Sequence, residues 1–152
     1  MLLHPDDQFH IGIVVDDLDA ARQWLTDTFG YEWGLDLQME YTMLLPDGPL
    51  TYQQRLQYSV TEPRLELVRS VEGTPLTPSS SGLHHVGYWC ADVESTSAEL
   101  VATGWTWECG GVLDDGSPAW AYHHNPLGVR VELVSLAMRE RGIEALWAPT
   151  GT

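Results

Sequence analysis

The sequence predicts an α+β fold in which two tandem βαβββ modules form one curled mixed sheet. Three observations predict it: an internal repeat, short apolar strands around one helix in each copy, and a length of 152 residues. The repeat aligns FHIGIVVDDLDAARQWLTDTFGYEW at 9–33 with HHVGYWCADVESTSAELVATGWTW at 84–107, and RLELV at 64–68 with RVELV at 130–134. Because a module of about 60 residues cannot bury a good core alone, the two are expected to enclose a common cleft.

The repeat also sets the organisation of the chain. We expect a single domain over residues 1–152, with module one at about 8–70 and module two at about 84–136. Between the modules lies VEGTPLTPSSSGL at 71–83, whose Pro, Ser and Gly content is typical of a linker. The remainder, 137–152, is a C-terminal tail that is expected to begin with a short helix.

The first strand of each module is an almost uniformly apolar run, at 9–15 and 84–90. A helix follows in each module, at about 18–28 and 93–103. Each helix has an aspartate at its N-cap and a glycine after its end, namely Asp17 with Gly30 and Asp92 with Gly104. The other expected strands lie near 37–45, 51–60, 64–70, 106–112, 118–124 and 129–135.

The composition excludes several classes of partner. Twenty-two acidic residues face seven basic ones, all arginine, for a formal net charge of −15. Such a field opposes binding to nucleic acids and to anionic membranes. No apolar run approaches the roughly 20 residues of a membrane helix, and the N-terminus lacks a secretory signal pattern. A cytoplasmic location and a small-molecule substrate are therefore expected.

A histidine and a glutamate occur at equivalent places in both modules. His10 and His85 lie in the first strands, and Glu66 and Glu132 lie in apolar runs of the last strands. An unpaired buried carboxylate costs several kcal/mol. Two carboxylates and two neutral imidazoles would instead balance the charge of one divalent cation.

The glycines two residues after the histidines, Gly12 and Gly87, leave room on the same strand face for a ligand. A plainer interpretation is a hydrogen-bonded core histidine and a solvent-facing glutamate in each module. The repeat favours the metal, because the plainer interpretation needs the same coincidence twice.

Four stretches, FHIGIVVDDLDAA, RLELV, LHHVGYWCADV and NPLGVRVELV, resemble the vicinal oxygen chelate superfamily. This group includes glyoxalase I, methylmalonyl-CoA epimerase, extradiol dioxygenases and fosfomycin or bleomycin resistance proteins, and the glyoxalase I and epimerase branches are the most similar. The resemblance implies a metal-binding cleft between paired modules. It also implies one divalent metal per chain (Ni, Co, Mn, Mg or Zn), held by His10, Glu66, His85 and Glu132, and it allows a homodimer.

This ligand set favours proton abstraction next to a carbonyl. Four protein ligands leave two adjacent positions of an octahedral ion for substrate, whereas a two-His, one-carboxylate dioxygenase site leaves three. We expect a metal-dependent isomerase, epimerase or lyase that stabilises an enediolate. Resemblance to glyoxalase I implies that Glu132 is the base, and its symmetry mate Glu66 is a second one. The alternatives are a non-catalytic antibiotic- or natural-product-binding protein and an extradiol-type dioxygenase.

Residues near the 125–128 turn are candidates for substrate binding. If this turn pairs His123 with Arg130, both face the metal; a one-residue bulge would turn His124 and Tyr122 inward instead.

By a similar count, Arg64, Gln57 and Arg55 are expected on the Glu66 side, where an arginine can bind a carboxylate. A plainer interpretation of these arginines is that they balance nearby acidic residues. A plainer interpretation of most tryptophans is that they pack in the core. The expected substrate-binding residues are His123, Arg130, Arg64, Arg55, Trp89, Trp120 and Tyr122.

Overall fold

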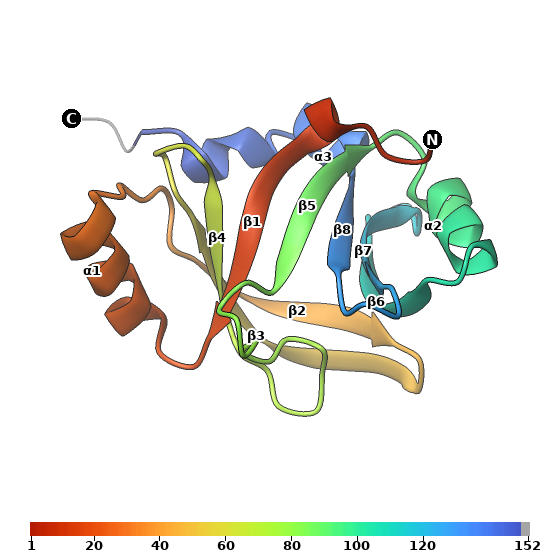
Figure 1. The fold of residues 1–152 in the computed structure, drawn as a ribbon, viewed down its shortest axis with the longest axis horizontal. Helices are drawn as coiled ribbons and strands as arrows, with labels where there is room; N and C mark the ends of the chain where they lie inside the picture. The colour runs from red at the N-terminus through yellow and green to blue at the C-terminus, as the bar shows by residue number, and fades with distance from the viewer. Residues whose placement is uncertain (150–152) are drawn as a thin grey trace. The chain divides into compact units, whose positions relative to one another are not determined.

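The computed structural model describes residues 1–149 and contains the order β-α-β-β-β twice (Figure 1). The first copy consists of β1 (Gln8–Val15), α1 (Leu18–Phe29), β2 (Leu37–Leu45), β3 (Gly48–Tyr58) and β4 (Leu65–Arg69). The second consists of β5 (His85–Cys90), α2 (Val93–Ala102), β6 (Thr106–Val112), β7 (Pro118–His124) and β8 (Arg130–Ser135). Short helices flank them: η1 (Pro5–Asp7), α3 (Leu136–Glu140) and η2 (Ile143–Trp147). The predicted strands and helices are confirmed to within a few residues.

The eight strands form a closed sheet in the order β1-β4-β3-β2-β6-β7-β8-β5. The β1–β4 and β5–β8 pairs are parallel, whereas β3–β4, β2–β6, β6–β7 and β7–β8 are antiparallel. Figure 1 shows β4 beside β1 and β8 beside β5. The predicted mixed, curled sheet is therefore confirmed. Within residues 1–149, no helix combines the length and apolar character needed to span a bilayer.

The described residues form two compact units, each with its own core. One unit comprises Met1–Phe9, Thr42–Thr51 and His85–Gly142, and the other comprises His10–Tyr41, Tyr52–His84 and 143–149. In the first, the buried core contains Cys90, Val93, Leu100, Ala121, Val131 and Leu133. In the second it contains Leu18, Leu25, Leu65 and Leu67. In each unit, apolar residues of the helix pack against apolar residues of the neighbouring strands.

Both helices begin at the predicted aspartates. The Asp17 carboxylate accepts the Ala20 N–H at 3.0 Å, and the Asp92 carboxylate accepts the Ser95 N–H at 2.9 Å. Helix α1 ends at Gly30, whose φ of 76° is accessible to glycine without steric cost. The caps place each helix directly after its first strand.

The predicted register of β7 and β8 is wrong by one residue. His124 pairs with Arg130 and Tyr122 with Glu132, so His123 lies on the opposite face of the sheet. The cause is Asn125, whose side-chain oxygen accepts the N–H groups of Leu127 and Val129, each at 3.0 Å. Its own N–H donates to the Val129 carbonyl, so the loop closes one residue later than predicted. The alternative register, with Tyr122 and His124 inward, is the one found.

The predicted positions of Gln57 and Arg55 are also wrong. Tyr58 pairs with Glu66 and Gln57 with Leu67, which turns Gln57 and Arg55 away from the Glu66 face. Ser59 sets this register, because its N–H donates to the Leu65 carbonyl and its hydroxyl accepts the Leu65 N–H, both at 2.8 Å.

Candidate metal centre

In the β1–β4 pair, a histidine and a glutamate meet on one strand face. Gly12 lies beside Glu66 in the register, and His10, two residues earlier, shares the face of Gly12. His10 Nε2 lies 3.0 Å from Glu66 Oε2, and the two side chains are 0% and 5% exposed. Because Gly12 has no side chain, the Glu66 carboxylate can reach across to the imidazole.

The β5–β8 pair repeats this arrangement. Gly87 lies beside Glu132, and His85 precedes Gly87 by two residues. His85 Nε2 lies 3.2 Å from Glu132 Oε2, and both side chains are again buried. The two strand pairs therefore carry the same three residues in the same register.

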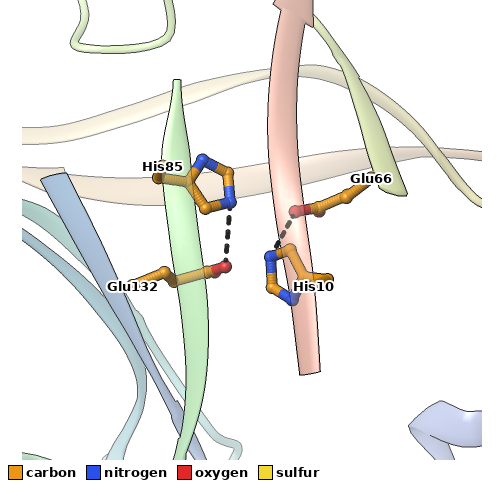
Figure 2. A group of neighbouring side chains, drawn as sticks. All are labelled: His10, Glu66, His85 and Glu132. Carbon is orange, nitrogen blue, oxygen red and sulfur yellow. Dashed lines mark ion pairs between the residues drawn. The ribbon is translucent and has the colours of Figure 1, made fainter. Parts of the chain in front are cut away.

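His10, Glu66, His85 and Glu132 are all buried, and each strand pair contributes one imidazole and one carboxylate, the donor types of a metal site. Figure 2 shows the two histidine–glutamate pairs, with the ion pair in each marked. Around an octahedral ion with bonds of about 2.1 Å, adjacent ligands are about 3.0 Å apart and opposite ones about 4.2 Å. The distance within each pair fits adjacent ligands, and two such pairs would neutralise a divalent charge. Each pair therefore has the donors that a metal site requires.

A tyrosine contacts each histidine. Tyr58, opposite Glu66, packs edge-on against His10 with ring centroids 5.5 Å apart. Tyr122, opposite Glu132, packs against His85 at 4.8 Å. Sequence reasoning named Tyr122 and missed Tyr58, because the two loops that precede the last strands differ in length and hide the correspondence.

Arg130 lies on the Glu132 face, as predicted, and binds an acid that the sequence analysis missed. Its Nε and Nη2 donate to the two oxygens of Glu108, at 2.6 and 2.9 Å. His124 Nδ1 lies 3.1 Å from the same carboxylate. Burial alone would raise the pKa of Glu108, but the hydrogen bonds and charges of Arg130 and His124 hold it below its ordinary value. An ionised Glu108 thereby fixes the Arg130 side chain.

The other two predicted arginines differ in their surroundings. Arg55 binds Asp19 and Asp36 on the α1 side of the sheet, away from Glu66. Arg64 donates to the Ser59 carbonyl at 2.6 Å, and its guanidinium carbon lies 4.7 Å above the ring of Trp147. Trp147 was missed because it lies in the tail, which has no counterpart in the repeat.

His123 is fully buried on the opposite face of β7, where its Nε2 lies 2.7 Å from the Ser97 hydroxyl of α2. Burial lowers the pKa of His123. A role for His123 on the Glu132 face is therefore incompatible with its position, and the reason is the one-residue register shift.

The two predicted tryptophans both contact other rings. Trp89 stacks on Phe9 with centroids 3.9 Å apart, and Trp120 packs against Tyr122 at 5.1 Å. Trp120 shares the Tyr122 face of β7, as alternation along the strand requires.

Comparison with known proteins gives the same family that the motifs indicate. A relative from an Actinomyces species, 2-epi-5-epi-valiolone epimerase, is 27% identical over 150 residues, covering 84% of this chain and 78% of the relative. A variant of Streptomyces coelicolor methylmalonyl-CoA epimerase, solved with 2-nitronate-propionyl-CoA, matches with a TM-score of 0.54 and 22% identity over 85% of this chain and 96% of that one. The Mycobacterium tuberculosis methylmalonyl-CoA epimerase matches with a TM-score of 0.50 and 19% identity over 85% and 87%.

These two structural matches establish a shared fold. The model of the glyoxalase/bleomycin resistance protein/dioxygenase superfamily matches residues 9–119, which is most of the chain. The chain therefore belongs to the glyoxalase/bleomycin resistance protein/dioxygenase superfamily.

Proposed function

We propose that the protein is a metal-dependent epimerase of the glyoxalase type, which removes and returns a proton next to the carbonyl of a small oxygenated metabolite. The observation that carries the proposal is the repeated His–Gly–Glu register of β1–β4 and β5–β8. The relatives named above support the choice of an epimerase among the isomerase and lyase reactions of the family.

In this proposal the two βαβββ modules surround one divalent ion, held by His10, Glu66, His85 and Glu132. The donor set supports this assignment, since neutral imidazoles and carboxylates suit Ni, Co, Mn, Mg or Zn. When bound, the ion supplies Lewis-acid stabilisation of the negative charge that develops on the substrate oxygen.

Glu132 is the proposed base. The role requires a carboxylate that is ionised before substrate arrives, and coordination to a divalent cation would favour this form; Glu132 Oε2 lies 3.2 Å from His85 Nε2, as adjacent ligands of one ion would. Epimerisation also requires a proton on the opposite side of the planar carbon. Glu66, in the equivalent position of the other strand pair, is the proposed second acid–base group.

The residues around the two glutamates have positioning roles in this proposal. Tyr58 and Tyr122 limit the motion of His10 and His85 and exclude water from the carboxylates. Arg130, held by Glu108, orients the substrate from the Glu132 face. A non-catalytic binding protein would have no need for two buried carboxylates, and a dioxygenase would have no need for the fourth ligand.

Deuterium exchange tests the proposal. The Mn²⁺- or Co²⁺-loaded protein is incubated in D₂O with a panel of α-hydroxy ketones and 2-substituted thioesters, and loss of the α-proton is followed by NMR. Glu132→Gln should lower exchange by about 10²–10⁴-fold, the usual contribution of general acid–base catalysis. Glu99→Gln, on the exposed surface of α2, is the matched control and should have no effect. Full exchange activity in Glu132→Gln would remove this residue from the mechanism.

A further inference from the structure

Module two contains a pocket between its helix and its sheet. The residues that line it include Val93, Glu94 and Ser97 of α2, Trp107 and Gly110 of β6, and Ala121 of β7. All of them belong to one compact unit, and Ala121 lies on the face of β7 opposite Tyr122 and Glu132. The pocket has a mostly apolar lining and a volume of about 200 Å³. A cavity of about 150 Å³ can hold a benzene ring, so this one accommodates a group about as large as a long side chain.

The helices show what lies at the same place in module one. Counted from the N-cap aspartate of each helix, Asp19 of α1 corresponds to Glu94 of α2, and Arg22 corresponds to Ser97. The Asp19 carboxylate accepts hydrogen bonds from Arg22 Nη2 at 2.7 Å and from Arg55 Nη1 and Nη2 at 3.0 and 2.8 Å. Module two keeps the acid but not these donors. Within residues 1–149, the Glu94 carboxylate makes no hydrogen bond or ion pair, although Glu94 lines the pocket.

The strands show the same difference between the modules. Counted back from the tyrosine that pairs with each glutamate, Arg55 and Gln57 of β3 correspond to Ala119 and Ala121 of β7. In module one, the Gln57 side chain accepts a hydrogen bond from Arg22 Nη1 at 2.9 Å, so both arginines lie on this face of the sheet. In module two, small side chains stand at the equivalent positions. The pocket is therefore the space that Arg22 and Arg55 fill in module one.

We propose that this pocket binds an alkylguanidinium group supplied by another molecule. The Glu94 carboxylate accepts its N–H groups, as the Asp19 carboxylate accepts those of Arg55. The Trp107 ring offers a face for a planar cation, and the apolar lining covers the alkyl chain. The positive end of the helix dipole does not prevent binding, because Arg55 already binds an acid of the first turn of α1.

The remaining charges around the pocket also favour a cation. Ser97, which lines the pocket, has its hydroxyl 2.7 Å from His123 Nε2. Burial lowers the pKa of His123, so this imidazole is neutral at pH 7 and does not repel a guanidinium. The formal net charge of the chain, −15, attracts cations over a longer range. The site uses neither of the histidine–glutamate pairs and goes beyond the proposed function.

Binding of matched probes tests the proposal. The probe n-propylguanidinium, which reproduces an arginine side chain, is titrated into the isotope-labelled protein and followed by NMR, with n-propylurea as its uncharged isostere. The cation should bind saturably and shift the Trp107 indole N–H and the Gly110 amide, and the urea should bind at least about fivefold more weakly. A capped Gly-Arg-Gly peptide identifies the source of the group. Tighter binding of the peptide than of the probe assigns it to an arginine of another chain, weaker binding assigns it to a small molecule, and either result supports the site.

Two variants locate the bound cation. Glu94→Gln should weaken n-propylguanidinium binding by about two- to fivefold, the range for an exposed ion pair, and Glu99→Gln, also exposed on α2, is the matched control. Ser97→Arg introduces a guanidinium where Arg22 lies in module one and should abolish probe binding. Mn²⁺ binding should be the same in all three variants, because none of these residues belongs to a histidine–glutamate pair. Equal affinity for the cation and the urea, or unchanged binding of the cation by Glu94→Gln, would overturn the proposal.

Discussion

Gly12 lies directly beside Glu66 in the parallel β1–β4 pair, on the strand face that also carries His10. A branched side chain at this position would occupy the space through which the Glu66 carboxylate reaches the imidazole. We therefore expect Gly12→Val to weaken Mn²⁺ binding by about 10–100-fold, as changes next to metal ligands commonly do. Calorimetric titration with Mn²⁺ measures this. Ile13→Val, on the other face of β1, is the control, and equal affinities in the two variants would contradict the proposed ligand geometry.

Metal binding should also stabilise the fold. A ligand that binds only the folded state at 100 times its Kd adds about 2.7 kcal/mol to the free energy of unfolding. Addition of excess Mn²⁺ to metal-free protein should therefore raise Tm, and EDTA should reverse the rise. His10→Ala and His85→Ala should each lose most of this shift, because each removes one of the proposed ligands. His4→Ala, at an exposed site near the N-terminus, should keep it. An equal Mn²⁺-dependent shift in all three variants would place the ion elsewhere.

Much of this architecture could be predicted because it depends on contacts between residues close in sequence and because the same pattern occurs in both modules. Asp17 and Asp92 cap helices through neighbours three residues away, and the His–Gly–Glu pattern depends only on strand alternation and register. Strand pairing across the hairpins could not be predicted in the same way. Side-chain hydrogen bonds in the loops set the register of these pairs. The Asn125 side chain accepts two backbone N–H groups in one loop, and the Ser59 hydroxyl accepts the Leu65 N–H in the other.

Contacts that occur only once were also beyond prediction. Glu108, which binds Arg130, and Trp147, which packs on Tyr58, have no equivalent in the repeat. Their partners are distant in sequence, so neither periodicity nor capping rules relate them to the site. These are the positions where the two halves of the repeat have diverged.

The Glu108–Arg130 ion pair should contribute stability that depends on pH. Glu108→Gln removes a charge from a largely buried pair and should cost about 1–3 kcal/mol at neutral pH. Because Arg130 and His124 lower the folded pKa of Glu108, the unfolded chain binds more protons as the medium becomes acidic. The contribution is thus present above about pH 5 and is lost as pH falls through the folded pKa. Urea unfolding of both proteins at pH 7 and pH 3.5 measures this, and a constant difference between them would contradict it.

His123 should make the protein sensitive to mild acid. Burial lowers its pKa in the folded state, so between that pKa and its ordinary value the unfolded state binds more protons. Stability should fall as pH drops from about 7 through this interval, by at most about 1.4 kcal/mol per pH unit for one group. In His123→Phe this part of the pH dependence should disappear, although the loss of the Ser97 hydrogen bond lowers stability at every pH. Urea unfolding between pH 7 and pH 5 checks the slope, with His4→Asn as the exposed control.

Arg55 and Arg64 provide a matched test of which strand face binds substrate. Arg55 donates to Asp19 and Asp36 on the α1 side, whereas Arg64 packs on Trp147. Arg55→Met should lower Tm but leave α-proton exchange and the Kd for Mn²⁺ within about twofold, as expected for a change remote from the Glu66 face. Arg64→Met should lower α-proton exchange by about two- to fivefold, because Arg64 lies two residues before Glu66, on the strand face where substrate is proposed to bind. If Arg55→Met impaired exchange and Arg64→Met did not, substrate would lie on the α1 side of the sheet, and the assignment of the Glu66 face to substrate would be wrong.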